Sequence, residues 1–321
     1  MKKVFKIICI FLVSLCLFLM ILKPETYIKS ALYGIKLWAL TVVPTLLPFF
    51  FFTSLLSVLG VTSILSKTLE SPCKFLFKTS GVSGYAFLMS VLSGYPVGAK
   101  IIADLYENKI INSDEATKFS TFCSTSGPLF VVGSVGFGMF SNKAVGYTLI
   151  ISHILSAILC GIVFRFYGNK TNTRQFCSPT QNNENALYNC VYSSVISVAC
   201  VGGFICVFGL ILDVFQNLNL LFPLVKLLNP LLGKDLSSSF CYGLIECTKG
   251  CKSLSVCLLS PLSVSLSSSL ISFGGLSVWA QSSIFLSRAK VNLKFFFLSK
   301  ILQTLFSFFL AYGLCLLFNF C

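Results

Sequence analysis

The chain has 321 residues, 55% hydrophobic and 11% charged, and 24 Lys and Arg against 10 Asp and Glu give a formal net charge of +14. Soluble domains carry roughly 25% charged residues, so this composition excludes an ordinary soluble protein and indicates a polytopic membrane protein. The basic residues stand singly between apolar segments rather than in a stripe. This pattern excludes nucleic acid as a partner and fits the Lys and Arg excess of cytoplasmic loops.

Seven segments are apolar over about 20 residues, the length that crosses a bilayer as a helix. They lie at Val4–Leu22, Pro44–Leu65, Phe119–Phe140, Ala144–Phe164, Val191–Asp213, Val264–Phe285 and Phe295–Phe320. The first has a basic start like a signal peptide, but no small-x-small cleavage site follows, so we expect a retained helix. Ser30–Val43 predicts an interfacial helix, and the polar stretch Gly168–Asn185 predicts a surface loop.

Two further apolar segments are too short or too broken to span a membrane. They are Gly84–Gly98, "GYAFLMSVLSGYPVG", and Ser239–Gly250, "SFCYGLIECTKG". Each is apolar for roughly ten residues and then meets glycine with polar neighbours, which is typical of a re-entrant or interfacial element. An ordinary loop between two full spans is the alternative.

The two halves of the chain resemble each other weakly. In each, a short apolar segment with a glycine-bearing tip precedes a span that carries a cluster of small residues, "CSTSGPLF" or "ISFGGLSV". Paired Gly- or Pro-interrupted segments in corresponding halves point to the binding site of a carrier. We therefore expect an all-α integral membrane protein with about seven transmembrane helices and two re-entrant hairpins in an inverted repeat. Its parts are an N-terminal helix (1–29), a first repeat (30–164), a cytoplasmic loop (165–190) and a second repeat (191–321).

The distribution of basic residues predicts the orientation. With the N-terminus in the cytoplasm, 16 of the 24 Lys and Arg fall inside, Lys300 among them, and 8 fall outside. This ratio favours a cytoplasmic N-terminus, and it makes the two hairpins enter from opposite sides.

The two tips and the two small-residue clusters carry the candidate site. A broken helix inside a bilayer must be buried in protein or line a wet cavity, and the amides at a half-helix N-terminus favour an anion. Close helix packing by small residues is the alternative explanation of the Ser and Gly clusters. Glu246 is the acid of greatest interest, because ionisable groups within spans are costly and usually functional.

Motifs for catalysis and metal binding are absent from the sequence. It has no HExxH, GxSxG or Walker A motif and no CxxC pair. His153 is the single histidine and is expected to be a hydrogen-bonded packing residue, and the 15 cysteines to act as small apolar residues. We therefore expect no catalytic residue, metal site or cofactor.

Several motifs together resemble the YlbJ family of sporulation integral membrane proteins, also called SpoVV. The longest is "SGYPVGAKIIADLYENKIINSDEATKFSTFCSTSGPLFVVGSVGFGMF" (Ser93–Phe140), and "GLIECTKGCKSLS" (Gly243–Ser255) and "SFGGLSVWAQ" (Ser272–Gln281) are similar to the same family. That family belongs with the nucleoside-recognition, or Gate, domain proteins, which resemble concentrative nucleoside carriers. In those carriers two hairpin tips and two unwound helices form a midplane substrate site.

The resemblance thus implies a substrate-binding site in this chain. Its residues would be Ser93, Gly94, Tyr95, Pro96, Gly98, Lys100, Ser124, Thr125, Ser126, Gly127, Pro128, Glu246, Thr248, Lys249, Gly250, Ser272, Gly274 and Gly275.

The function implied by the resemblance is alternating-access transport of a small anion, dipicolinate, across the outer forespore membrane of a sporulating bacterium. The implied partners are the lipid bilayer, the anion, a coupling ion (H⁺ or Na⁺) and a second copy in a homo-oligomer. A nucleoside-type carrier of small metabolites and a non-transporting spore-envelope assembly protein remain alternatives.

Overall fold

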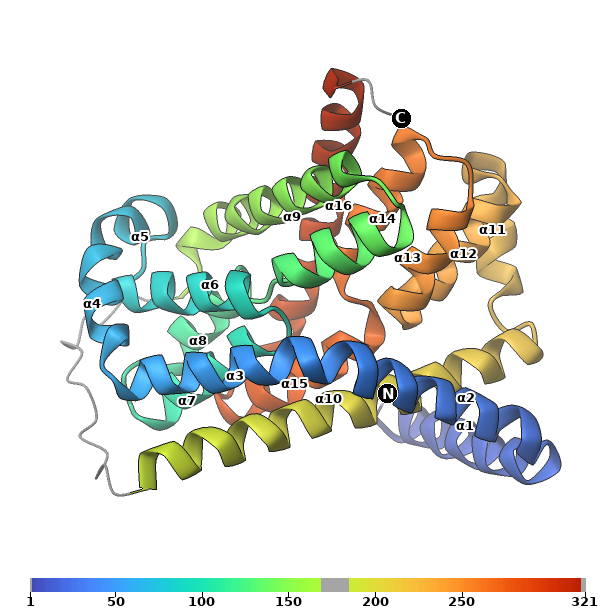
Figure 1. Cartoon of the computed structure of the whole chain (residues 1–321), viewed down its shortest axis with the longest axis horizontal. Helices are drawn as coiled ribbons and strands as arrows, with labels where there is room; N and C mark the ends of the chain where they lie inside the picture. The colour runs from blue at the N-terminus through green and yellow to red at the C-terminus, as the bar shows by residue number, and fades with distance from the viewer. Residues whose placement is uncertain (1, 169–184, 319–321) are drawn as a thin grey trace.

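The computed structural model describes residues 2–168 and 185–318, which form helices joined by turns, with no strand among them (Figure 1). The all-α integral membrane fold expected from the sequence is confirmed. The loop expected at Gly168–Asn185 lies outside the described residues apart from its two ends, as do the last residues of the final expected span.

Within the described residues, four helical stretches are long and apolar enough to cross a membrane, and up to six if two bent pairs are each counted as one span. The four are Lys143–Phe166, Ala186–Asn217, Pro261–Arg288 and Leu293–Phe318. The bent pairs are Leu46–Val58 with Val61–Thr68, at 82°, and Glu70–Phe77 with Gly81–Ser93, at 91°. The first bend falls inside the expected span Pro44–Leu65, at Gly60, whose φ of +80° suits glycine.

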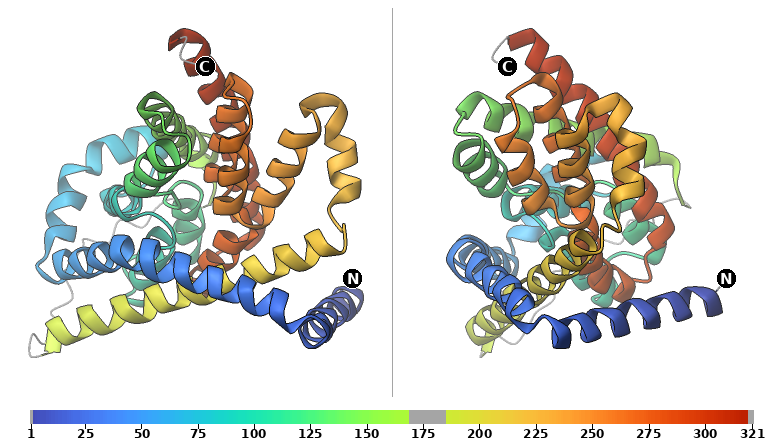
Figure 2. Two further views of the ribbon diagram at one scale, coloured as in Figure 1. Left: turned by 45° about the vertical axis from the view of Figure 1, so that its right-hand side comes forward. Right: turned by 90° about the vertical axis from the view of Figure 1, so that its right-hand side faces the viewer.

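The N-terminal quarter is a chain of helices around the edge of the molecule. Its elements are α1 (Lys2–Leu22), α2 (Pro24–Leu37), the π-helical segment η1 (Trp38–Val42), α3 (Val43–Val58), α4 (Val61–Thr68) and α5 (Glu70–Phe77). The segment Ser30–Val43, expected as an interfacial helix, covers the second half of α2, all of η1 and the first residue of α3, which follow one another without a break. Helix α1 contacts α2 and α10 and extends away from the rest of the chain (Figure 2).

Each half of the remaining chain then contains a helical hairpin, an interrupted helix and a long helix. In the first, these are α6 (Gly81–Ser93) with α7 (Val97–Glu107), α8 (Ser113–Ser120) with the π-helical η2 (Leu129–Met139), and α9 (Lys143–Val163), which ends in the short η3 (Phe164–Phe166). In the second, they are α12 (Lys234–Ile245) with α13 (Cys247–Val256), α14 (Pro261–Phe273) with α15 (Gly275–Arg288), and α16 (Leu293–Phe318). Between the halves lie α10 (Ala186–Asn217) and α11 (Phe222–Leu232).

Local sequence explains where these helices start and break. Asn112 caps α8 in a capping box with Glu115, and Ser260 caps α14 in the same way with Ser263. The segment Phe119–Phe140, expected as a span, is interrupted because Gly127 and Pro128 follow the turn after α8, and proline has no N–H to continue a helix.

The two halves interlock rather than fold side by side. One buried cluster joins α6, α7 and α8 to Leu286, Ala289 and Phe296 of the second half. The other joins Val131 and Leu149 of the first half to α13 and α14. In the lower part of Figure 1, α3 and α10 run next to each other. Each hairpin tip is therefore held by elements of both halves.

Candidate functional site

A cavity of about 440 Å³ lies where both hairpins and both interrupted helices break. Hairpin 1 (α6–α7) contributes Ser93, Gly94 and Tyr95, and the first break contributes Ser126 and Gly127. Hairpin 2 (α12–α13) contributes Glu246, Cys247, Thr248 and Lys252, and the second break contributes Gly274 with Ser277 and Gln281 on α15. Most of the remaining wall is apolar and comes from Leu46, Phe49, Phe130, Val201 and Val278. The fold thus brings four chain breaks, distant in sequence, to one chamber.

The tip of hairpin 1 meets the first break through backbone. Gly94 has a φ of +82°, which side chains rarely adopt, and a Cβ built on it would lie 2.6 Å from the Gly127 nitrogen. A Cβ on Gly98 would lie 1.7 Å from the Cys123 carbonyl oxygen. Ser90 adds a hydrogen bond to the Thr125 hydroxyl at 2.8 Å. Glycine at both positions is what permits this close approach.

The tip of hairpin 2 is organised by a carboxylate. Glu246 is the N-cap of α13 and accepts hydrogen bonds from the Thr248 nitrogen at 3.2 Å and the Lys249 nitrogen at 2.7 Å. Its side chain is buried, and the helix dipole stabilises its negative charge. The first-turn amides of α13 therefore hold the protein's own carboxylate. Lys252 is the basic side chain in the cavity wall.

A wider pocket of about 770 Å³ adjoins the central cavity. The two share Leu37, Met139, Thr248 and Lys252 in their walls. Lys249 lines this outer pocket and forms an ion pair with Asp213 of α10, with 2.7 Å between Nζ and Oδ1. Hairpin 2 is thus tied to α10 in the wall of this outer pocket.

Behind the cavity, His153 of α9 joins the two breaks. The Ser126 backbone nitrogen donates to His153 Nε2 at 2.8 Å, and His153 Nδ1 lies 2.8 Å from the Ser272 hydroxyl. A backbone N–H only donates, so Nε2 is unprotonated and Nδ1 carries the hydrogen that Ser272 accepts. His153 is fully buried, as a hydrogen-bonded packing residue should be.

The predicted site residues divide into those that reach the cavity and those that lie behind it. In its wall are Ser93, Gly94, Tyr95, Ser126, Gly127, Glu246, Thr248 and Gly274. Outside the wall are Pro96, Gly98, Lys100, Ser124, Thr125, Pro128, Lys249, Gly250, Ser272 and Gly275. The hydroxyls of Thr125 and Ser272 are bonded to protein partners, to Ser90 and His153 respectively.

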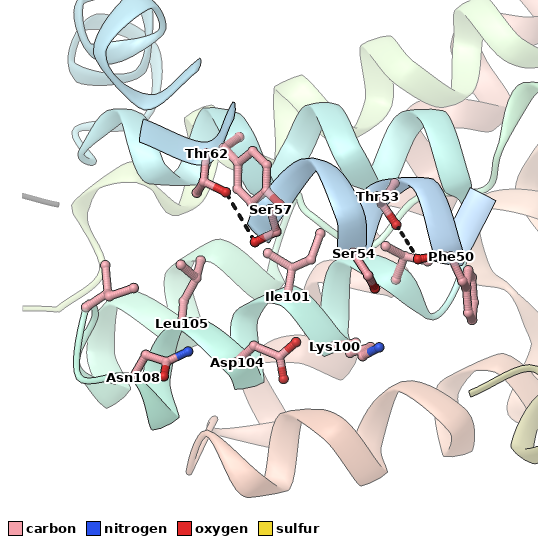
Figure 3. Close-up of a pocket in the computed structure, with 13 residues that line it drawn as sticks. Phe50, Thr53, Ser54, Ser57, Thr62, Lys100, Ile101, Asp104, Leu105 and Asn108 are labelled. Atoms are coloured by element: carbon pink, nitrogen blue, oxygen red, sulfur yellow. Dashed lines mark hydrogen bonds between the residues drawn. The ribbon is translucent and has the colours of Figure 1, made fainter. Parts of the chain in front are cut away.

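Lys100 lies in a different pocket of about 100 Å³ between α3 and α7. Figure 3 shows Lys100 and Asp104 on one face of α7, opposite Ser54 and Ser57 of α3. Lys100 and Lys252 each follow a hairpin tip in sequence, but Lys252 lines the cavity wall and Lys100 does not.

Lys300 does not lie in a cytoplasmic loop, and the charge count that assigns it to one is wrong. It lies within α16 with 2% of its surface exposed. Its Nζ donates to the Ser124 carbonyl oxygen, to the Tyr95 hydroxyl at 3.2 Å and to Gln303 Oε1 at 2.9 Å. The available signal was a lysine eight residues inside an apolar helix, since ionisable residues within spans are rare and usually functional.

Comparisons with known proteins agree with this architecture. A family model described as "Gate: Nucleoside recognition" matches residues 39–143, which include hairpin 1 and the first break. The chain is similar to the sporulation integral membrane protein YlbJ of Bacillus subtilis (strain 168), with 31% identity over 332 residues, 94% of this chain and 81% of the relative. No solved structure matches the chain.

Proposed function

Because this chain belongs to the YlbJ family of sporulation integral membrane proteins, we propose that it is a membrane carrier for a small anionic metabolite, dipicolinate. It works in a bacterial cell membrane, the outer forespore membrane, and its N-terminus lies in the cytoplasm. No catalytic step or cofactor belongs to this function. The observation that carries the proposal is the convergence of two hairpin tips and two helix breaks on one cavity.

The cavity suits a small planar ring with charged substituents. Its volume lies within the range of about 300–1,000 Å³ usual for small-molecule sites. Apolar side chains such as Phe49 and Phe130 offer faces for a ring, and Ser126, Ser277 and Gln281 offer hydrogen-bond donors. Lys252 supplies a positive charge at the side of hairpin 2. The Glu246 carboxylate repels a bound anion less than an unbonded carboxylate would, because two backbone amides already donate hydrogen bonds to Glu246.

Alternating access would follow from an inverted repeat. In this mechanism each hairpin is a gate on one side of the cavity, and the two open in turn. Supporting observations are the repeated order of hairpin, interrupted helix and long helix, and the backbone contact of each tip with a break. The outer pocket beside Thr248 and Lys252 would be the route opened by hairpin 2.

With Lys300 moved from the loops to a span, 15 basic residues remain inside against 8 outside, which still favours a cytoplasmic N-terminus.

A nucleoside is the second candidate substrate. The Gate match favours it, since the matched residues 39–143 include part of the cavity wall. Neutral groups in the wall, among them Tyr95, Ser277 and Gln281, could bind ribose hydroxyls and a base edge. A nucleoside carries no charge for Lys252 to recognise, and this difference separates the two candidates.

Uptake of labelled dipicolinate and labelled nucleosides into proteoliposomes tests the proposal. We expect dipicolinate uptake by the wild type and about tenfold weaker apparent affinity in Lys252→Gln, which corresponds to roughly 1.4 kcal/mol of lost charge interaction. Lys234→Gln changes an exposed lysine at the start of α12 and should behave like the wild type.

Three results would contradict the dipicolinate assignment. Nucleoside uptake that is indifferent to Lys252→Gln would identify the second candidate. No flux of either solute, in protein shown to be folded, would favour a non-transporting role in assembly of the spore envelope. An equal loss of dipicolinate affinity in Lys252→Gln and Lys234→Gln would show that Lys252 does not bind the substrate.

A further inference from the structure

The Lys300 ammonium group is buried in α16 directly behind the tip of hairpin 1. A charged amine in this position is costly unless hydrogen-bond acceptors replace its water. Three oxygens do so, from the Ser124 carbonyl, the Tyr95 hydroxyl and the Gln303 amide. The Tyr95 ring lies 5.0 Å from Nζ and the Phe296 ring 5.9 Å, both within range of a cation–π contact.

No carboxylate accompanies this charge. None of the ion pairs within 4 Å among residues 2–168 and 185–318 includes Lys300. The Ser124 carbonyl that binds Lys300 instead belongs to the unwound segment between α8 and η2. Helix C-termini and unwound carbonyls attract cations, and broken helices in carriers use them to bind Na⁺ or H⁺. The oxygens around Lys300 are neutral and form the type of site that takes a monovalent cation.

We propose that the Lys300 ammonium group occupies a cation site at the first helix break, in place of a metal ion, and that its proton keeps the tip of hairpin 1 closed. The coupling of this proton to transport rests on the proposed function, whereas the cation site itself does not. The carrier then needs no Na⁺ at this position, and the exchangeable ion there is H⁺.

The hydrogen bonds of Tyr95 show how the proton acts on the hairpin. With Lys300 protonated, the Tyr95 hydroxyl accepts from Nζ and donates to the Ser272 carbonyl oxygen at 3.2 Å. A neutral amine has a lone pair and one hydrogen fewer, so it accepts from the Tyr95 hydroxyl. The hydroxyl then turns away from Ser272, and the bond between hairpin 1 and the second break is lost. The released proton passes to solvent.

The surroundings of Lys300 contain few groups that titrate with it. Those facing it are Tyr95 from hairpin 1, Cys123 from the first break, and His153 and Cys160 from α9. The neighbouring α14 and α15 contact α16 through hydroxyl and ring groups, at the pairs Ser268–Ser307 and Trp279–Phe297, and Thr117 of α8 accepts a hydrogen bond from the Asn292 nitrogen just before α16. Both ring nitrogens of His153 are engaged in hydrogen bonds, to Ser126 and Ser272. Lys300 is the titratable group that bonds directly to the Tyr95 hydroxyl, so its protonation changes that bond.

Chemical rescue tests the site without any transport measurement. Lys300→Ala leaves an empty space that a small cation can fill, whereas Lys300→Met fills the space without a charge. We expect both variants to unfold at lower temperature than the wild type. Methylammonium at tens of millimolar should raise the unfolding temperature of Lys300→Ala by several degrees and leave that of Lys300→Met unchanged. Lys294→Ala, at an exposed position of the same helix, should match the wild type.

Hydrogen exchange of the wild type provides a second test that needs no variant to fold. After correction for the intrinsic rate, exchange at the hairpin 1 tip (93–98) should accelerate as the pH rises. Exchange at the hairpin 2 tip (245–250) should not, because its bonds do not involve Lys300.

The proposal is overturned by a Na⁺-dependent rise in the wild-type unfolding temperature that Lys300→Ala abolishes, by equal rescue of the Ala and Met variants, or by tips that respond alike to pH. A protein that shows the rescue and the pH response but carries no solute would refute the transport function and leave the cation site standing.

Discussion

Each of the two hairpin tips is stabilised by a charged side chain, and the two charges have opposite signs. The tip of hairpin 1 lies against the unwound segment after α8, where the Lys300 cation binds carbonyl and hydroxyl oxygens. The tip of hairpin 2 starts a helix, where the Glu246 carboxylate binds amides. Each charge matches the backbone groups that it meets. At these two places in the fold, a charged side chain of the chain itself therefore satisfies the backbone groups that a break leaves unpaired.

The tips also differ in how firmly they are packed. Most of α6 is buried, and Gly94 and Gly98 place hairpin 1 in backbone contact with the first break. Hairpin 2 borders the wide outer pocket, and the partly exposed pair of Lys249 and Asp213 ties it to α10. We infer that hairpin 2 opens at lower free-energy cost than hairpin 1.

The largest effect is expected at Gly98. A methyl group there would overlap the Cys123 carbonyl oxygen at 1.7 Å and crowd the Ser90 hydroxyl at 2.7 Å. Gly98→Ala should therefore destabilise the protein by about 1–3 kcal/mol or more, the cost of overpacking a core, and should abolish transport. Thermal unfolding in detergent measures the change.

Gly203→Ala is the matched control for Gly98→Ala. The substitution is the same and also lies within a helix, α10, but no atom lies within 4 Å of the added Cβ. It should be neutral or stabilise by up to about 1 kcal/mol, because alanine favours helix. Equal effects at Gly98 and Gly203 would show that hairpin 1 does not need its close backbone contact.

A smaller effect is expected at Glu246. Glu246→Ala removes the cap of α13 and should cost about 1 kcal/mol. Hydrogen exchange should accelerate at residues 245–250 and stay unchanged at the hairpin 1 tip. Asp235→Ala serves as the control, since Asp235 is an exposed acid in the first turn of α12. Acceleration at both tips would mean that the hairpins are coupled rather than anchored independently.

The smallest effect on stability is expected at the pair of Lys249 and Asp213. A double-mutant cycle should give a coupling free energy of roughly 0.2–1 kcal/mol, as usual for partly exposed ion pairs. The exposed pair of Arg288 and Glu107 provides a comparison away from the hairpin tips. In proteoliposomes, loss of the Lys249 pair should speed solute uptake if hairpin 2 is the easier gate, and loss of the Arg288 pair should not. An equal response to the two losses would contradict the inference.

Much of the architecture could be predicted from sequence because it depends on local chemistry. Apolar length identified the long helices, and glycine and proline located the breaks at Gly94, Gly127 and Gly274. Local chemistry could not predict which of the candidate site residues line the cavity and which lie outside it. Lys100 and Lys252 occupy similar positions after their tips, yet only Lys252 reaches the cavity, because α3 covers α7 on the side of Lys100.

Lys300 and His153 mark the limit of sequence reasoning. Both are isolated ionisable residues in apolar helices, and only Gln303, three residues from Lys300, is a partner close in sequence. The other partners, Tyr95, Ser124, Ser126 and Ser272, lie 27 to 205 residues away.

The sequence by itself determined that this protein is a helical membrane protein with broken helices, because hydropathy and backbone preference act over a few residues at a time. Only the tertiary structure decided which breaks meet, which hydroxyls face the cavity and which charge neutralises each helix end. These depend on the packing of α9 and α16 against both halves, which joins residues that no local pattern connects.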